Sequence, residues 1–401
     1  MSGTKSRLDR VWWDSKRSAC ASLYLALGFV AACGGNGANS SSSTPMNSAG
    51  AGMNGGAGSG NIAPAHVVGN CDGLGAVDQF EEITPPGVNL SGNGIVHVML
   101  DPVHSGVIYC GTDENGLFKS TDCGSTWAKM NTGTNGALLD SGILWVMAID
   151  YTNPDVLYAG SLYGTDKSLL RSLDGGIDWD SMFPAGSLVA NTVQYNFFQS
   201  LDLDPTDHQH LVVSFHADCL SGGFGPECLA QTKDGGATWT LFKGPLSGWQ
   251  EASGPYVLNS TTWLLSTPQS GLFYTADSGG TWENVGPGTN LSFYKAADDS
   301  YYAASDYGVL HSPDAHVWTK IDASPTSNGL VGDGVRLFTS KRDADTDQQP
   351  YFTAPESDST TWTPYASPKL AHGGHYLRFD ADHHLMYSAN TTSGLWRVVT
   401  R

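Results

Sequence analysis

The octet STDCGSTW covers residues 120–127, and three later stretches repeat its pattern. SLDGGIDW covers 172–179, TKDGGATW covers 232–239 and TADSGGTW covers 275–282. All four fit [ST]-x-D-x-G-x-[TD]-W. Asp can accept hydrogen bonds from the backbone of a turn and Gly tolerates a positive φ, so the pattern predicts a tight turn between two strands.

Each octet lies within a longer repeat. Residues 96–130, VHVMLDPVHSGVIYCGTDENGLFKSTDCGSTWAKM, alternate apolar runs with turn residues and predict four antiparallel strands. The same order leads to the octets that end at Trp179, Trp239 and Trp282. Three less regular units follow; the fifth has a shortened octet, and the seventh stops after three strands. Four-stranded units repeated in this way predict an all-β fold, a seven-bladed β-propeller with antiparallel blades.

The missing strand of the seventh unit has a candidate near the other end of the chain. Residues 78–87, DQFEEITPPG, resemble the segments that follow the octets but have no unit before them. We expect this N-terminal strand to complete the seventh blade and close the ring, which leaves few exposed sheet edges. The propeller domain is therefore predicted to cover residues 75–401.

The segment before the propeller is predicted to be a targeting and tethering region. Residues 1–32 combine a basic start with a short apolar run, as a signal peptide does. The run ends in VAAC, which is similar to a bacterial lipobox with Cys33 as the lipidated residue. Residues 33–74 then form a Gly/Ser-rich tether. We expect a protein of the bacterial cell envelope, at the outer surface or in the periplasm, lipid-anchored or secreted.

Charge and cysteine content indicate which ligands and which cellular compartment suit the chain. The chain has 20 basic and 39 acidic residues, a formal net charge of −19, which disfavours nucleic-acid binding. Seven cysteines fit an oxidising compartment. Cys219 and Cys228 bracket a short loop and form the best disulfide candidate. Cys71, Cys110 and Cys123 leave one odd thiol, and Cys71 with Cys123 is one possible pair among them. We expect a monomer that meets the membrane only through its lipid anchor.

The octets resemble the Asp-box, or BNR, repeat. The resemblance covers most of the chain after the tether and implies that the octets are structural: the Asp holds the turn, and the Trp packs between blades. The residues to which it assigns these roles are Asp122, Asp174, Asp234, Asp277, Trp127, Trp179, Trp239 and Trp282. A string of calcium sites is the alternative, but the acidic residues are too sparse for an oxygen cage.

Strand order divides the ring into two faces. The octets and the Asp-Pro turns share one face, which we name the turn face. The opposite loop face carries the loops between second and third strands and the connections between blades, and we expect any chemistry there, near the axis. Its candidate catalytic residues are Glu251, Asp113, Glu114 and His216; its candidate substrate-binding residues are Trp249, Tyr163, Tyr307, Arg342, His375 and Arg378.

Each candidate also has a plain structural explanation. Asp113 and Glu114 precede Asn-Gly and would suit a simple turn. Tyrosines at a rim often only pack, and His216 at a strand end is as consistent with a structural role. His372 and His375 have no third ligand at usable spacing, so we expect no metal site and no cofactor.

Propellers with Asp-box repeats include sialidases, xyloglucan-cleaving glycosidases, polysaccharide lyases and non-catalytic binders. The Phe/Tyr-Arg-Ile-Pro motif of the sialidases is missing, so sialidase activity is not expected. The first hypothesis is a glycoside hydrolase acting on polysaccharide or oligosaccharide, with Glu251 and either Asp113 or Glu114 as its paired carboxyls. One alternative is a polysaccharide lyase on a uronic-acid glycan, with His216 or His375 as base and Lys341, Arg342 or Arg378 neutralising the carboxylate. The other is a non-catalytic glycan- or protein-binding surface lipoprotein.

Overall fold

The computed structural model describes residues 64–162, 169–183, 198–215, 219, 228–246, 254–267, 269–290, 292–341, 351–368, 370 and 376–401. These residues are almost entirely strands and turns, with two short 3₁₀ segments, η1 (Gly136–Ser141) and η3 (Glu356–Asp358). None of the helices in the described ranges is long and apolar enough to cross a membrane.

Seven four-stranded sheets make up the fold. The first three are β3 (Ile95–Leu100), β5 (Ile108–Thr112), β6 (Leu117–Ser120) and β7 (Ala128–Lys129); β8 (Ile143–Ile149), β9 (Leu157–Leu162), β10 (Leu169–Ser172) and β11 (Asp180–Ser181); and β12 (Phe198–Asp204), β13 (Asp207–Phe215), β14 (Cys228–Thr232) and β15 (Thr240–Lys243). The next two are β16 (Gly254–Val257), β17 (Trp263–Thr267), β18 (Gly271–Thr275) and β19 (Glu283–Gly286); and β20 (Phe293–Lys295), β21 (Tyr301–Ser305), β22 (Gly308–Ser312) and β23 (Thr319–Lys320). The last two are β24 (Ser327–Gly332), β25 (Arg336–Lys341), β26 (Tyr351–Pro355) and β27 (Thr363–Tyr365); and β28 (Tyr376–Asp380), β29 (Leu385–Ala389), β30 (Leu395–Val399) and β2 (Phe80–Glu82).

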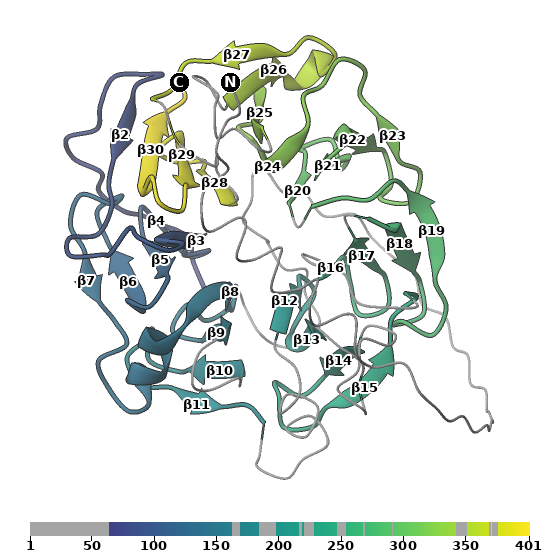
Figure 1. The fold of residues 1–401 in the computed structure, drawn as a ribbon, viewed down its shortest axis with the longest axis horizontal. Coiled ribbons are helices and arrows are strands. Elements are labelled where there is room, and N and C mark those ends of the chain that lie inside the picture. The colour runs from purple at the N-terminus through teal and green to yellow at the C-terminus, as the bar shows by residue number, and fades with distance from the viewer. Residues whose placement is uncertain are drawn as a thin grey trace, which may run out of the picture. The chain divides into compact units, whose positions relative to one another are not determined.

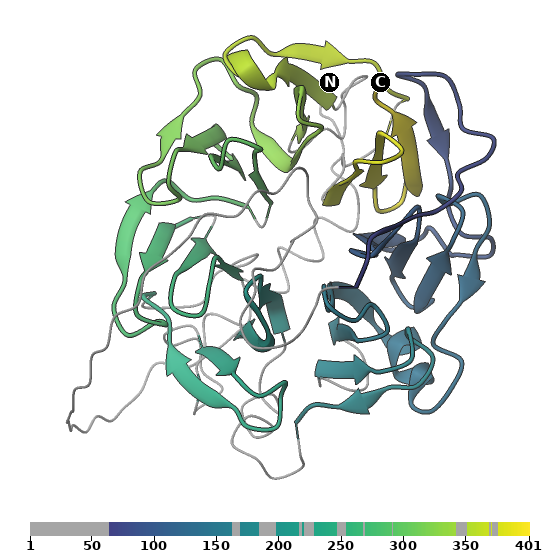
Figure 2. The same ribbon diagram turned by 180° about the vertical axis from the view of Figure 1, so that it is seen from behind.

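The sheets are the blades of a ring, and the first strand of each lies nearest the middle (Figures 1 and 2). Contacts join β3 to β8, β8 to β12, β12 to β16, β20 to β24, β24 to β28 and β28 to β3. Between blades four and five, Tyr256 of β16 stacks on Phe293 of β20 with ring centroids 4.6 Å apart. The molecule is a seven-bladed β-propeller, as the repeat predicts.

Burial falls from the second strand of a blade to its outer edge. Every residue of β5, β17 and β29 is buried, whereas both residues of β7, β11 and β23 are exposed. The core therefore consists of apolar layers between neighbouring blades. One such layer joins Tyr109 of the first blade to Leu157 and Trp179 of the second.

The octets form the turns before the outer strands, as predicted. In the first octet, Asp122 accepts hydrogen bonds from the backbone N–H of Thr126 (2.8 Å), from the Thr126 hydroxyl (2.6 Å) and from the Ser120 hydroxyl (2.7 Å). Equivalent bonds reach Asp234 and Asp277. Asp174 accepts from the Asp178 N–H and the Ser172 hydroxyl and lacks the bond from a threonine hydroxyl, since Asp178 replaces that threonine. Each octet Gly has a positive φ, for example 104° at Gly176. Trp179 is 1% exposed, and its indole N–H bonds the Gly176 carbonyl at 2.9 Å.

The seventh blade obtains its outer strand from the N-terminal side of the chain. β2 pairs antiparallel with β30, with Phe80 opposite Val398 and Glu82 opposite Trp396. The Arg397 side chain bonds Glu81 at 2.9 Å and donates to the Cys123 carbonyl at 2.9 Å. The strand thus ties blade seven to blade one.

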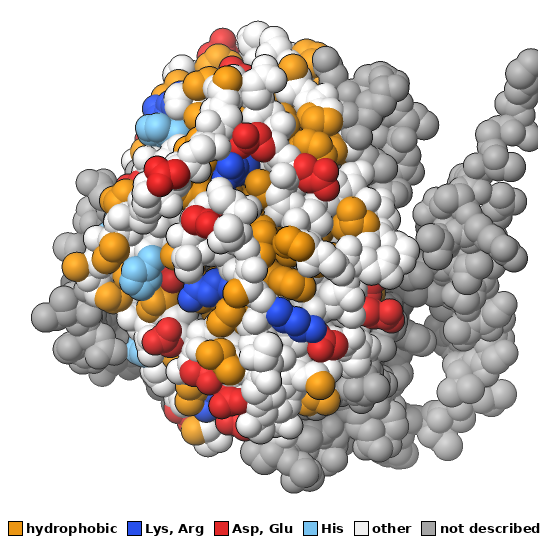
Figure 3. Space-filling model, turned by 90° about the vertical axis from the view of Figure 1, so that its left-hand side faces the viewer, with side chains coloured by type: hydrophobic (Ala, Val, Ile, Leu, Met, Phe, Trp, Pro, Cys, Tyr) orange, Lys and Arg blue, Asp and Glu red, His pale blue; other side chains and the backbone are white. Residues whose placement is uncertain are grey.

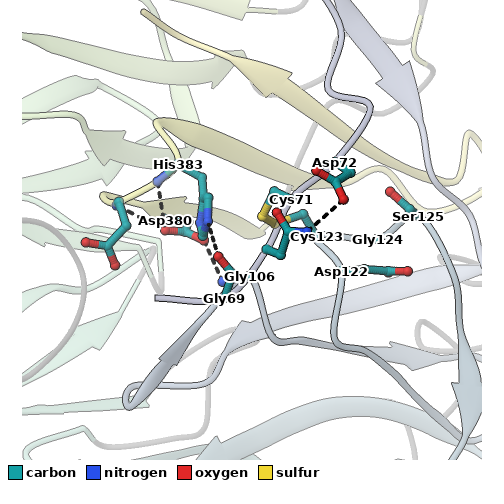
Figure 4. The surroundings of a disulfide bond; sticks show 12 residues. Gly69, Cys71, Asp72, Gly106, Asp122, Cys123, Gly124, Ser125, Asp380 and His383 are labelled. Atoms are coloured by element: carbon teal, nitrogen blue, oxygen red, sulfur yellow. Dashed lines mark hydrogen bonds and ion pairs between the residues drawn. A yellow bond between two sulfur atoms is a disulfide. The ribbon is translucent and has the colours of Figure 1, made fainter. Parts of the chain in front are cut away.

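A second element of this closure has no counterpart in the sequence prediction. β1 (Val67–Val68) pairs in parallel with β4 (His104–Ser105), which lies in the turn between β3 and β5. A disulfide joins Cys71 to Cys123, and His383 lies beside it, with its Nε2 3.1 Å from the Gly69 carbonyl oxygen (Figure 4). Residues 64–83 therefore cross the seam between the last and first blades on the turn face. Figure 3 shows the outer side of this part of the ring, where acidic, basic and apolar side chains are interspersed.

Candidate functional site

Asp113, one of the predicted catalytic carboxylates, lies on the loop face between β5 and β6. Its Oδ2 accepts hydrogen bonds from the backbone N–H of Asn93 (2.8 Å) and from the Asn93 amide (3.1 Å). Its backbone forms an isolated bridge with Ile143, the first residue of β8. Asp113 therefore holds the connection between blades seven and one, and this structural role occupies one of its two oxygens.

Two other predicted residues also reach the loop face. Glu114 is exposed, with a φ of 57°, and donates its backbone N–H to the Gly142 carbonyl. Tyr307 lies between β21 and β22 and is 55% exposed. The remaining candidates, Glu251, His216, Trp249, Tyr163, Arg342 and His375, lie outside the described residues, as do Cys33 and His372. The described part of the chain therefore places Asp113 and Glu114 on the first blade and Tyr307 on the fifth, three blades away around the ring.

Arg378 belongs to a different group, at the middle of the ring. We name His97, Asp202, Tyr376 and Arg378 the axial cluster, because all four lie on the inner strands β3, β12 and β28. Tyr376 and Arg378 are two residues apart on β28 and share a face, with the guanidinium 5.4 Å from the tyrosine ring centroid. The His97 ring packs on the other side of the seam, with its centroid 4.0 Å from that of Tyr376. The Tyr376 hydroxyl donates to the Trp145 carbonyl of β8 at 3.2 Å.

The described residues give the cation of the axial cluster few partners. Among the described residues, Arg378 donates one hydrogen bond, from Nη1 to the Leu377 carbonyl at 2.9 Å, and none of their carboxylates lies within ion-pair distance. Burial lowers the pKa of Arg378, but a guanidinium stays charged throughout the physiological range. His97 is 4% exposed; burial and the Arg378 charge both lower its pKa well below the ordinary value, so it is neutral at pH 7.

Asp202 reaches the cluster from β12 of the third blade, across the ring from β28. Its Oδ2 accepts the Val257 N–H at 2.6 Å and its Oδ1 the Leu203 N–H at 3.0 Å. Burial raises the pKa of Asp202 to about 7, although these two hydrogen bonds and Arg378 act in the opposite direction. The side chain is half-buried, surrounded by protein yet with some surface left open. Asp202 is therefore a carboxyl group that exchanges its proton near neutral pH.

Sequence reasoning found Arg378 and missed Asp202, although both occupy the same repeat position. Each inner strand ends in an Asp or Asn that caps the next turn: Asp101, Asp150, Asp204, Asn259, Asp298, Asp333 and Asp380. The residues two positions earlier are Met99, Ala148, Asp202, Val257, Ala296, Val331 and Arg378. Five of these seven are apolar and two are charged, with opposite signs. Aligning the repeats on the capping residue would have identified the pair.

One set of potential metal ligands occurs in the described residues. The sulfur atoms of Cys71 and Cys123 and a ring nitrogen of His383 lie within 4.8 Å of one another. The two sulfurs are joined in the disulfide, and His383 Nδ1 lies 2.9 Å from Asp380 Oδ2. These partners occupy the donor atoms, so the set stabilises the seam. A second disulfide joins Cys219 to Cys228, and Cys110 is free and buried.

The ring and its inner strands define the class of protein, a seven-bladed β-propeller with a charged axial cluster. No protein-family model matches the sequence. The oligoxyloglucan-reducing end-specific xyloglucanase of Emericella nidulans is 26% identical over 217 residues, which are 49% of this chain and 25% of that enzyme. The chain thus spans about a quarter of the length of the curated relative it matches.

Two solved structures illustrate the range of this fold. The GH74 xyloglucanase from Xanthomonas campestris has a TM-score of 0.53 at 17% identity, over 80% of this chain and 54% of the enzyme. YCF48, solved with a D1 peptide bound, has a TM-score of 0.58 at 14% identity, over 82% of this chain and 99% of that protein. At such identities the likeness extends to the fold alone.

Proposed function

We propose that the chain is an extracellular carbohydrate-active propeller of glycoside hydrolase type. The observation that carries the proposal is the 26% identity to a xyloglucanase over 217 residues, about half of this chain. The octets support it, since they resemble the Asp-box repeat and form turns of the kind that resemblance implies. The substrate class is a polysaccharide or oligosaccharide.

The proposed chemistry uses two carboxyl groups on the loop face. Hydrolysis of a glycosidic bond needs an acid and a base or nucleophile, with carboxyls about 5–9.5 Å apart. We assign Glu251 as one member and Asp113 or Glu114 as the other. Glu114 is the freer of the two, because Asp113 also holds Asn93.

Asp202 is not the partner of Asp113 in such a pair. Asp113 bridges Ile143, seven residues before the capping Asp150, whereas Asp202 lies two residues before its capping Asp204. Five residues of strand separate the two levels by about 15 Å along the ring axis, which exceeds the spacing of a catalytic pair. The axial cluster is therefore a separate site, deeper in the ring.

The test is the release of reducing ends from a panel of neutral and acidic polysaccharides. Glu251→Gln and Glu114→Gln should each lower the rate by about a hundredfold or more while leaving polysaccharide binding intact. Asp306→Asn, which removes another loop-face carboxylate, is the matched control. Full activity in Glu251→Gln would refute this catalytic assignment, and an ultraviolet-absorbing unsaturated product would indicate a lyase in its place.

A non-catalytic binding function is the second candidate. It is favoured by the comparison with YCF48, since this chain matches nearly the whole length of a propeller that binds a peptide but only about half of the xyloglucanase. Saturable binding to a glycan or peptide, with no product from any polysaccharide, would favour this candidate.

The location is part of the proposal. Two disulfides fit an oxidising compartment such as the cell exterior. Lipidation at Cys33 would attach the tether to the membrane. Incorporation of labelled palmitate that Cys33→Ser abolishes is the expected result; equal incorporation in that variant would rule out the anchor.

A further inference from the structure

We propose that the axial cluster binds the carboxylate of a uronic acid residue, with Arg378 as the cation that holds it. The substrate of the proposed function would then be an acidic polysaccharide. The inference rests on the proposed function for the carbohydrate part of the ligand and on the geometry of the axial cluster for the carboxylate.

The first step is the unused donor capacity of Arg378. A guanidinium has five N–H donors in a planar fork, and among the described residues Arg378 uses one of them, to donate to the Leu377 carbonyl. A half-buried cation without a paired anion is costly, because it has lost much of its hydration and gained no counter-charge. A bound carboxylate would supply both the charge and two parallel acceptors for the fork.

The second step is the neutrality of the surroundings. His97 beside Arg378 is neutral at pH 7, and Tyr376 keeps its proton because burial raises the pKa of its hydroxyl. Asp202 interacts electrostatically with Arg378 from across the ring, and with a pKa of about 7 it is about half protonated at neutral pH. No described carboxylate forms an ion pair with the guanidinium, so among these residues its charge is open to an incoming carboxylate.

The third step concerns the body of the ligand. Tyr376 and Tyr256 lie half-buried on two inner strands, and their rings already pack on His97 and Phe293. The sugar part of the ligand is therefore inferred from the similarity to a xyloglucanase over about half of this chain. That similarity favours a uronate over an acidic peptide.

The net charge of the chain sets a constraint on the ligand. At −19 the protein repels polyanions at long range. Recognition at Arg378 must therefore be local, and a short uronate segment should suit it better than a long polyuronate at low salt. Added salt would weaken binding to a basic surface patch, and this salt dependence distinguishes such a patch from the proposed site.

The experiment compares trigalacturonate with its methyl ester on the full chain by isothermal titration calorimetry. Esterification removes the negative charge and leaves the sugar rings unchanged, so the pair isolates the carboxylate. We expect the acid to bind at least about tenfold more tightly than the ester, the gain of one charge-assisted contact. Equal affinities would overturn the proposal.

Variants assign the preference to Arg378. Arg378→Met should abolish the preference for the acid, Arg378→Lys should retain part of it, and Arg171→Met is the matched control because Arg171 lies on β10 and bonds the Gly235 carbonyl. Thermal unfolding separates binding from folding: Arg378→Met should be as stable as the wild type or more so, since it removes an unpaired buried charge. Unchanged preference in Arg378→Met, or a lowered melting temperature showing a structural cation, would overturn the proposal.

Two further outcomes distinguish this inference from the proposed function. Hydrolysis of neutral polysaccharides without any preference for the acid ligand would overturn the carboxylate site and leave the glycoside hydrolase proposal standing. Tighter binding of a hexaglutamate peptide than of trigalacturonate, with no binding to any polysaccharide, would overturn both in favour of a peptide-binding propeller.

Discussion

The octet turns and the axial cluster use aspartate in opposite ways. Asp277 accepts hydrogen bonds from the Thr281 N–H, the Thr281 hydroxyl and the Thr275 hydroxyl, and these bonds lower its pKa. Asp202 has two backbone donors, yet burial raises its pKa to about 7. The octet aspartates serve to hold their turns, whereas Asp202, which has no counterpart in the other blades, titrates near neutral pH.

The same contrast applies to charge. The octet carboxylates lie at the exposed rim, where water screens them and several donors satisfy them. Arg378 lies at the middle of the ring with one acceptor among the described residues. The octet carboxylates thus stabilise repeated turns, whereas the charge of Arg378 has no counter-ion among the described residues and could be met by a ligand.

The largest effect that would test this contrast is the loss of an octet tryptophan. Trp179→Ala should lower the free energy of unfolding by about 3–5 kcal/mol, because the ring is 1% exposed between blades one and two. Urea unfolding followed by circular dichroism measures the change.

Trp282→Ala is the control, since Trp282 is half-buried and its loss should cost less. A smaller loss in Trp179→Ala than in Trp282→Ala would contradict the view that burial between blades makes the octets structural.

Local chemistry explains how much of the fold could be predicted from the sequence. An octet such as residues 120–127 contains its own turn donors and acceptors, so its structure follows from neighbours in the chain. The β2 strand was predictable because its sequence resembles the segments that follow the octets. The parallel pair of β1 and β4 was not, since two-residue strands carry no pattern and depend on the seam between the first and last blades.

The axial cluster depends on distant residues and was only partly predictable. Arg378 stood out as a cation on an inner strand, but nothing near Asp202 in the sequence indicates that Val257 bonds its carboxylate or that burial raises its pKa. The hydrogen bond comes from a residue 55 positions further along the chain, and the burial comes from blades across the ring. Asp113 shows the converse: its turn-like context was visible in the sequence, and the structure gives it a turn-like role with Asn93.

The next test is the effect of pH on Asp202→Asn. Because burial raises the folded-state pKa to about 7, the folded state holds this proton between about pH 4 and pH 7 while the unfolded state releases it. Wild-type stability therefore falls as pH rises through this window and stays reduced above it. Asp202→Asn removes that loss, so the variant should equal the wild type at pH 4 and exceed it by about 1–3 kcal/mol at pH 8.

Paired urea titrations at the two pH values measure this difference. Asp180→Asn, an exposed carboxylate on β11, should show no such dependence. If Asp202→Asn were less stable than the wild type at pH 8, Asp202 would be an ionised structural residue like those of the octets, and the contrast between the two regions would fail.

The smallest expected effect comes from the corresponding change in an octet, Asp122→Asn. Burial alone would raise the pKa of Asp122, but hydrogen bonds from Thr126 and Ser120 outweigh it and hold the pKa below its ordinary value. The ionised carboxylate therefore stabilises the fold above the unfolded-state pKa of about 3.9, and this contribution is lost as pH falls through the lower folded-state pKa. The amide replaces one acceptor by a donor, so the variant should be about 1 kcal/mol less stable at pH 7, with the gap closing in acid. Asp202→Asn is expected to raise stability at neutral pH, whereas Asp122→Asn is expected to lower it. Measuring both variants across the same pH range therefore tests whether rim and axis aspartates have opposite roles. If both substitutions changed stability in the same direction, position in the ring would not decide the role.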